Sequence, residues 1–277
     1  MKLTTKIQIY NQKEMRIIGL KRSGNHAIVN WILEQHKQIN SDYCFINDVR
    51  PNTNPLKNKN GHSDYNDMVD KPKSLFVYSY EDRALKDICS QEFYEKRIEY
   101  VGKSLKVYAP LILRDPFNYF ASRLKTNRKK GAQWAWGDEN KKNRHTQINM
   151  WLSYAKEFIN KMNIIKDNKI PVDFNLWHES FSYRMILADR LDIEFTDAGR
   201  EGIYRAGGGS AFNGRRMHNK ASDMDINERW KKMVNDDYYI SLFTDDIIDM
   251  SVKIWGKKKF EKVIDKIKIK RENQTKK

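Results

Sequence analysis

Cysteine, proline, glycine and long apolar runs are all scarce in this chain of 277 residues. Cys44 and Cys89 are its only cysteines, too few for a disulfide framework, so reduced thiols are the simpler expectation. No apolar stretch approaches the roughly 20 residues that a membrane-spanning helix needs. The chain also lacks a basic start followed by an apolar run, so no secretory leader is expected. These absences predict a soluble, cytoplasmic protein without a membrane span.

Positive charge is in excess: 52 Lys and Arg against 36 Asp and Glu give a formal net charge of +16. Such a charge concentrates anionic ligands, although an ordinary solvated surface explains it equally well. Much of the charge lies in the tail, where residues 251–277 are expected to form a basic C-terminal helix that frays. Phe260, Val263 and Ile267 recur there at helical spacing, so we expect this helix to dock onto the body.

Apolar runs and turn signals predict a single α/β domain over residues 1–277, with a central, mostly parallel sheet flanked by helices. A chain of this length can bury one large core. We expect strands over residues 15–20, 43–46, 74–80, 108–113 and 171–175. We expect helices over residues 27–36, 117–126 and 147–162, with a broken helical stretch over 83–101.

The first strand runs into a short basic loop and then into a helix. Gly19 and Gly24 have the spacing of a Walker A loop, but Asn25 and His26 stand where Lys and Ser/Thr belong. An ordinary ATPase or kinase is therefore not expected. The backbone N–H groups of Ser23, Gly24 and Asn25 could still wrap an anion at the positive end of the helix, with charge from Lys21 and Arg22. The other interpretation is a tight turn with solvated cations.

The fourth expected strand runs into Arg114-Asp115-Pro116. Asp115 suits an N-cap and Pro116 suits the first helical position. Arg114 is then at the carboxyl end of its strand, where open α/β sheets bind ligands. Ser122 follows the cap by about two turns and so lies on the same helix face. Arg114 and Ser122 are therefore placed to close on one phosphate.

With these two segments the chain resembles the PAPS-dependent sulfotransferases, over roughly residues 15–235. The 5′-phosphosulfate loop of that family reads Lys/Arg-Ser-Gly-Thr, and Arg22-Ser23-Gly24-Asn25 is similar to it. The family's 3′-phosphate motif reads Arg-(Asp/Asn)-Pro with a Ser eight residues after the Arg; Arg114, Asp115, Pro116 and Ser122 match it. A departure is Ala27, which stands where the family commonly has Trp.

A late segment resembles the family more loosely. Ser210, Phe212 and Arg215 follow a glycine run and are similar to an element that closes over the nucleotide, with Phe212 suited to stacking on adenine. A flexible connector is the alternative, and the family's Arg-Lys-Gly string is missing. The resemblance implies PAPS as donor, PAP as product, a P-loop-like 5′-phosphosulfate loop and no metal. The residues that it implies for the cofactor are Lys21, Arg22, Ser23, Gly24, Asn25, His26, Arg114, Ser122, Ser210, Phe212 and Arg215.

Arg22, Glu81 and His26 are the catalytic candidates. Arg22 holds the family's cation position, so it is expected to stabilise charge that develops during transfer. An acceptor hydroxyl also needs a base. Glu81, just after the third strand, is the first choice, Asp82 the second and His26 the third. Glu81 could instead cap the segment that follows it. His145, His178 and His218 have no partner at a useful spacing and are expected to be structural or surface histidines.

Two long irregular segments, residues 48–73 and 127–146, are expected to form the acceptor cleft. Trp134 and Trp136 could stack there on sugar rings, or simply anchor the loop. The sequence thus predicts sulfuryl transfer from PAPS to an acceptor hydroxyl, with a glycan or glycolipid as the candidate acceptor. The alternatives are a phosphotransferase with a degenerate P-loop, an inactive relative that binds PAP, and a basic nucleic-acid-binding protein, which is ranked last because it leaves the Arg114–Ser122 match unexplained.

Overall fold

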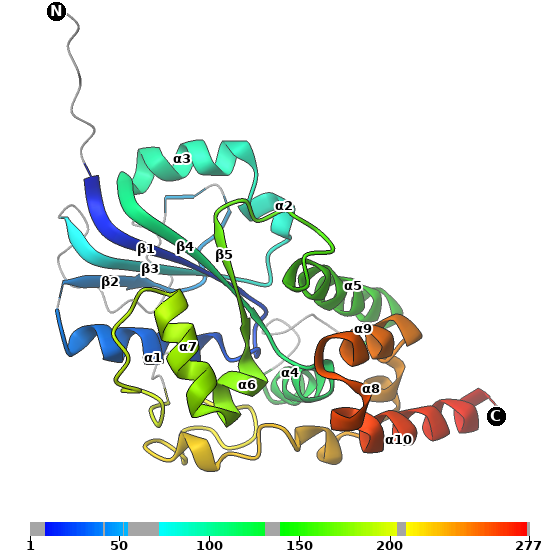
Figure 1. The fold of residues 1–277 in the computed structure, drawn as a ribbon. Helices are drawn as coiled ribbons and strands as arrows, with labels where there is room; N and C mark the ends of the chain where they lie inside the picture. Colours follow the sequence, from blue (N-terminus) through cyan, green and yellow to red (C-terminus); the bar gives the residue numbers. More distant parts are fainter. Residues whose placement is uncertain are drawn as a thin grey trace, which may run out of the picture.

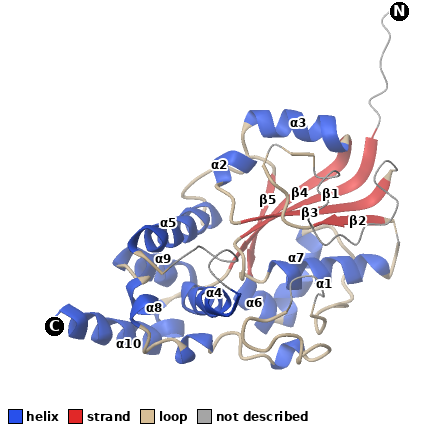
Figure 2. Cartoon of the chain, turned by 180° about the vertical axis from the view of Figure 1, so that it is seen from behind, coloured by secondary structure: helices blue, strands red, loops and turns tan. Residues whose placement is uncertain are grey.

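The computed structural model describes residues 9–40, 42–51, 53–54, 72–130, 139–203 and 209–275. Its centre is a five-stranded sheet in the order β2-β3-β1-β4-β5, in which every strand pair is parallel (Figures 1 and 2). The predicted α/β class with a parallel sheet flanked by helices is therefore confirmed. The strands are β1 Ile9–Gly19, β2 Tyr43–Ile46, β3 Lys73–Glu81, β4 Lys103–Leu113 and β5 Asn168–Asp173.

Helices cover both faces of the sheet and gather at its carboxyl edge (Figure 1). They are α1 Asn25–Lys37, α2 Leu85–Ile88, α3 Gln91–Val101, α4 Pro116–Lys130, α5 Lys141–Phe158, α6 Phe174–Glu179, α7 Phe181–Arg190, α8 Asp237–Ser241, α9 Asp245–Trp255 and α10 Lys257–Thr275, with 3-10 turns η3 Ala221–Asp223 and η4 Arg229–Lys232. None of the described helices is long and apolar enough to cross a membrane.

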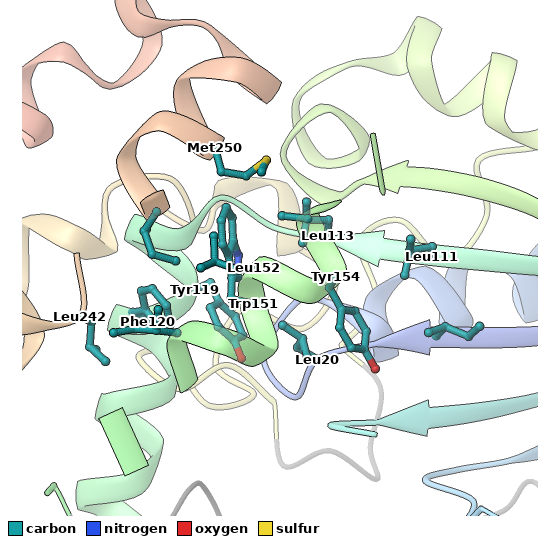
Figure 3. Packing of buried hydrophobic residues seen from close by; sticks show 14 of the residues in the cluster. Leu20, Leu111, Leu113, Tyr119, Phe120, Trp151, Leu152, Tyr154, Leu242 and Met250 are labelled. Atoms are coloured by element: carbon teal, nitrogen blue, oxygen red, sulfur yellow. The ribbon is translucent and has the colours of Figure 1, made fainter. Parts of the chain in front are cut away.

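β2, β3 and the carboxyl-terminal halves of β1 and β4 are buried on both faces, which explains why these stretches read as mostly apolar runs rather than as alternating ones. In β1, Ile18 packs with α3, α4 and α5 on one face, while Met15 and Ile17 pack with α1 and α7 on the other. Figure 3 shows Trp151 of α5 between strand residue Leu113 and Phe120 of α4. The core therefore fixes the helices against the carboxyl ends of β1 and β4.

The sequence placed the fifth strand too far along the chain. We expected it over residues 171–175, but β5 ends at Asp173 and α6 begins at Phe174. The side chain of Asp173 accepts hydrogen bonds from the backbone N–H groups of Asn175 and Leu176, so it caps α6 and stops the strand. Asn175 and Trp177 therefore lie on a helix.

The second irregular segment is also shorter than expected. Residues 127–130 continue α4, and α5 already begins at Lys141, where Asn140 caps it by accepting a hydrogen bond from the N–H of Asn143 (3.0 Å). Trp134 and Trp136 lie outside the described residues, as does most of residues 48–73. The expected acceptor cleft therefore remains a prediction.

Candidate anion-binding site

The loops that follow β1, β3 and β4 meet at the carboxyl edge of the sheet, because parallel strands all end on the same side. Figure 1 shows the β1–α1 turn and the start of α4 close to one another there. The segment from Gly209 to η4, which follows the start of α4 by more than 80 residues, lies at the same place. Arg22 Nη2 donates a hydrogen bond to the carbonyl of Gly209 there (3.0 Å). Three distant parts of the chain thus share one site.

The β1–α1 loop owes its shape to two residues in the left-handed region. Arg22 has φ 79° and Gly24 has φ 96°. A Cβ atom on Gly24 would stand 2.1 Å from the ring of Phe174, so only glycine fits there. The helix α1 starts at Asn25 directly after this turn, and no side chain caps its first turn. The turn therefore presents the positive end of α1 to the edge of the sheet.

Part of the predicted anion cradle is used by the protein itself. The N–H of Ser23 donates to Leu20 O (3.0 Å), so it closes the turn instead of facing a ligand. Lys21 Nζ lies 3.0 Å from Asp48 Oδ2, so Lys21 is held in an ion pair. The hydroxyl of Ser23 is different: the residue is 1% exposed, and its Oγ has no hydrogen-bond partner among the described residues. Ser23 thus retains a buried polar atom to offer to a ligand.

Asp82 and Arg123 hold this loop in position. Asp82 Oδ1 accepts from the N–H of Lys21 (2.9 Å), while its Oδ2 pairs with Arg123 Nη2 at 2.5 Å. Arg123 also donates to the carbonyl of Lys21 (3.1 Å). Because both oxygens of Asp82 are engaged in bracing the loop, Asp82 is a structural residue in this arrangement and a poorer base than Glu81.

Two arginines converge on Ser122. Arg114 Nη1 donates to Ser122 Oγ at 3.2 Å, as the spacing in the sequence predicts, and Arg229 Nη1 donates to the same oxygen at 2.8 Å. Arg114 also donates to the carbonyls of Arg22 (3.3 Å) and Ile226. Arg114 is 2% and Arg229 6% exposed. Sequence reasoning missed Arg229, whose place depends on the tertiary fold alone.

Arg22, Arg114 and Arg229 form a cluster of positive charge. The pKa of Arg114 is lowered to about 10, mainly by burial; the charge of Asp115 opposes this shift and the charge of Arg22 adds to it. Burial, followed by the charges of Arg114 and Arg22, holds the pKa of Arg229 well below its usual range. Burial also lowers the pKa of Arg22, against an opposing effect of Glu81. Within the described part of the chain, none of the three forms an ion pair with a carboxylate.

Such a cluster fits an anion that carries more than one negative charge. Unpaired buried cations are costly, and an anion between them offsets both the burial and the mutual repulsion. Two further donors are available, because Arg22 Nε and Arg114 Nε are buried without a hydrogen-bond partner among the residues described. Arginine forks match the oxygens of phosphate and sulfate groups in two-pronged contacts. The residues present therefore fit a phosphorylated ligand.

The late segment contributes more than the sequence indicated, but through a different arginine. Ser210 Oγ accepts from Arg229 Nη2 (2.8 Å), and the guanidinium of Arg229 lies over the ring of Phe212 at 5.3 Å. Ser210 and Phe212 thus lie against Arg229, and their role in binding a nucleotide stays a prediction. Arg215 is solvent-exposed, and no hydrogen bond joins its side chain to the site among the described residues. Gly207 and Gly208 lie outside the described residues.

A buried polar network supports Arg114 from behind. Asp115 caps α4 by accepting from the N–H of Asn118 (2.9 Å), which confirms the predicted N-cap. Its other oxygen accepts from Asn175 Nδ2 (2.7 Å), and Asn175 Oδ1 accepts from the N–H of Asp115 (3.1 Å). Trp151 Nε1 donates to the carbonyl of Arg114 (3.1 Å). The backbone at Arg114 is thereby fixed by α4, α5 and α6 together.

Glu81 lies beside the loop at the end of β3. It is 7% exposed, and its Oε1 accepts from Asn25 Nδ2 at 2.8 Å. His26 Nε2 lies 3.8 Å from the same oxygen and 3.1 Å from Asn47 Oδ1. The three catalytic candidates therefore gather around the β1–α1 turn, to which Arg22 itself belongs.

The remaining histidines behave as the sequence suggested where their contacts are described. His178 lies within hydrogen-bond distance of Ala221 O (3.3 Å), and His218 Nδ1 accepts from the N–H of Ile203 (3.0 Å). Burial, with the charge of Arg200, lowers the pKa of His178 to about 4. No group of three or more His, Cys, Asp or Glu side chains in the described residues is arranged to hold a metal ion.

No protein-family profile matches this chain, and no curated protein matches it either. Among solved structures, the sulfotransferase domain from the curacin biosynthetic pathway is similar to it, with a TM-score of 0.49 and 13% sequence identity; the match covers 87% of this chain and 96% of that one. We infer function below from the site residues and their motifs.

Proposed function

We propose that the protein is a sulfotransferase that transfers a sulfuryl group from PAPS to a hydroxyl of its acceptor. The observation that carries the proposal is the cluster of Arg22, Arg114 and Arg229 at the carboxyl edge of a parallel sheet. Arg114 and Arg229 are buried, Arg22 is half-buried, and none of the three forms an ion pair with a carboxylate among the described residues. Arg114 and Ser122 are 3.2 Å apart and belong to the motif that the sulfotransferase family uses for a 3′-phosphate. The motif resemblance and the geometry point to the same ligand.

In this proposal two groups of residues hold the donor. Arg114, Ser122 and Arg229 bind the 3′-phosphate, and Arg229 replaces Arg215 as the cation from the late segment. Arg22, the hydroxyl of Ser23 and the first N–H groups of α1 bind the 5′-phosphosulfate, with Gly24 making room. Phe212 lies close enough to Arg229 to flank the adenine.

The donor supplies an activated sulfuryl group, whose transfer forms a bond between sulfur and the acceptor oxygen and breaks the bond to the 5′-phosphate oxygen. Arg22 stabilises the negative charge that builds on the departing phosphate, because a fixed cation in a buried site needs no reorganisation. Glu81 accepts the proton of the acceptor hydroxyl. Asn25 orients the Glu81 carboxylate through the 2.8 Å hydrogen bond, and His26 lies next to it. The acceptor is a glycan or glycolipid hydroxyl in this proposal.

Calorimetric titration with PAP, AMP and ATP·Mg²⁺ tests the donor site. PAP is expected to bind much more tightly than AMP, because only PAP carries the 3′-phosphate for Arg114 and Arg229. Arg114→Ala should weaken PAP binding about 10- to 100-fold while changing AMP binding little, since it removes charge-assisted bonds to that one phosphate. Equal affinities for PAP and AMP would refute the 3′-phosphate site, and a preference for ATP·Mg²⁺ would favour a phosphotransferase.

Transfer itself is tested separately. Incubation with ³⁵S-labelled PAPS and a panel of glycan and glycolipid acceptors should give a labelled product in wild type. Arg22→Ala should lower turnover more than PAP affinity, because its contribution rises as charge develops in the transition state. PAP binding without turnover on any acceptor would instead indicate a protein that only binds the nucleotide.

A further inference from the structure

One face of α10 carries a row of lysines that the donor site does not use. Lys258, Lys262, Lys266 and Lys270 follow one another at intervals of four residues, and we call them the lysine row. Each step of four residues advances only about 40° around a helix, so the row stays on one side over about 18 Å. Like charges at this spacing repel one another, so the row does not stabilise α10.

The helix is held in place by other residues. Phe260, Val263, Ile264 and Ile267 form its buried side and are nearly inaccessible. Glu261 and Asp265 flank the row, three residues after Lys258 and Lys262 respectively. Among the residues described, no ion pair joins Lys258, Lys262 or Lys266 to a carboxylate, although Lys259 pairs with Glu179 at 3.1 Å and Arg271 with Asp245 at 2.7 Å. The packing of its buried side therefore explains why α10 docks onto the body, but it does not explain why the lysine row is present.

The row faces the segment that completes the donor site. Lys266 Nζ lies 5.6 Å from the centre of the Trp230 ring, and Trp230 directly follows Arg229. Lys232 Nζ lies 5.4 Å from the ring of Phe212, which it shares with Arg229. Figure 2 shows α10 beside α8 and α4, at the same end of the molecule as the carboxyl edge of the sheet. Positive charge thus continues from the buried arginines through η4 to the outer surface of α10.

The rings along this path do not suit nucleic acid. Binding of single strands uses exposed aromatic faces on which bases stack. Trp230 is 7% exposed and has Lys231 and Lys266 near its ring, while Phe212 has Arg229 and Lys232 near its own. A flexible chain with negative groups and hydroxyls needs no stacking, only cations in a row.

We propose that the lysine row, with Lys232, binds an acidic glycan, meaning a linear carbohydrate with carboxylate or sulfate groups, and leads its hydroxyls to the donor site. This rests on the proposed sulfotransferase function and narrows its acceptor. The net charge of +16 adds long-range attraction for the same ligand.

Fluorescence anisotropy with fluorescein-labelled oligogalacturonate tests the proposal, with a neutral maltooligosaccharide and single-stranded oligo(dT) as comparisons. The triple variant K258Q/K262Q/K266Q removes exposed charges and keeps residues that form helices well. It should bind oligogalacturonate about 100-fold more weakly than wild type. The matched control K86Q/K156Q/K166Q removes three exposed lysines from other elements and should lose much less affinity.

Three results would overturn the proposal: no binding of oligogalacturonate by wild type, an equal loss in both triple variants, or tighter binding of oligo(dT), which would indicate a nucleic-acid surface. PAP titration of the same variants separates this proposal from the proposed function. Loss of oligogalacturonate binding with unchanged PAP affinity supports the lysine row as an acceptor surface. A wild-type protein that binds PAP but no acidic glycan would refute the row and leave the donor site standing.

Discussion

The substitution Arg229→Met is expected to keep or raise the stability of the fold while it weakens the binding of PAP. Arg229 is almost fully buried, and its charge is opposed by burial and by Arg114 and Arg22. Because an arginine guanidinium stays protonated in proteins, the folded state bears this cost. Methionine keeps much of the length and removes the charge. Replacing a buried ion by an apolar group of similar volume is often neutral or stabilising by about 1–4 kcal/mol.

The same change removes a cation that the proposed 3′-phosphate needs. Hydrogen bonds to charged groups contribute about 1.5–3 kcal/mol, so PAP should bind about 10- to 150-fold more weakly. Thermal unfolding with and without PAP measures both effects in one experiment. At a PAP concentration of about 100 times the wild-type Kd, the ligand stabilises wild type by about 2.7 kcal/mol. A variant with a Kd about 100-fold higher would gain only about 0.4 kcal/mol.

A variant that loses several kcal/mol of stability but keeps its shift with PAP would refute this reasoning, because Arg229 would then be a structural residue. Arg215→Met should be measured beside it, since Arg215 is the exposed arginine that the sequence indicated. An equal loss of PAP affinity in Arg215→Met would return the phosphate contact to Arg215.

Three further substitutions probe the turn, the base and the pH response. Glu81→Gln should lower turnover about 10²- to 10⁴-fold in the labelled-transfer assay with PAP affinity retained; normal turnover would exclude Glu81 as the base. Gly24→Ala should abolish PAP binding in calorimetry, because the new Cβ meets Phe174 at a positive φ; wild-type affinity would contradict the loop geometry. His178 has its pKa lowered from 6.5 to about 4 by burial, so the unfolded chain binds more protons between these values and stability is lost as pH falls through this window. His178→Gln should flatten that loss, about 1–3 kcal/mol in urea unfolding at pH 5 against pH 7.5, and an unchanged pH slope would argue against it.

The sequence predicted those parts of the site that depend on residues close together in the chain. Asp115 caps its helix and Ser122 lies within reach of Arg114, because an N-cap and a spacing of two helical turns act within one short segment. The sequence also placed β2 and β3 to within one residue at each end, but it found only the carboxyl-terminal parts of β1 and β4. Those parts are mostly apolar and buried, whereas the first halves of β1 and β4 carry polar residues that hide the strand signal.

The rest depends on contacts between distant parts of the chain. Arg229 reaches Ser122 because the late segment folds back to the carboxyl edge of the sheet. The spacing of residues in the sequence does not indicate this contact. Lys21 was expected to meet a ligand, but Asp48 from another loop pairs with it. Asn175 reads as a strand residue, yet the Asp173 cap places it on a helix against Asp115. Short helices such as α6 and α8 have too few turns to show a periodic pattern.

The order of the strands also affects how the protein is made. β1 is synthesised first but occupies the centre of the sheet, where Met15 pairs with Val77 on one side and Tyr108 on the other. Its neighbours follow about 60 and about 90 residues later, and such distant pairings fold slowly. At about 5–20 residues per second, β1, whose carboxyl-terminal half is mostly apolar, remains without either partner for several seconds during synthesis. The nascent chain is therefore a natural client for a chaperone that covers exposed strands, and slower elongation at lower chaperone supply should increase aggregation.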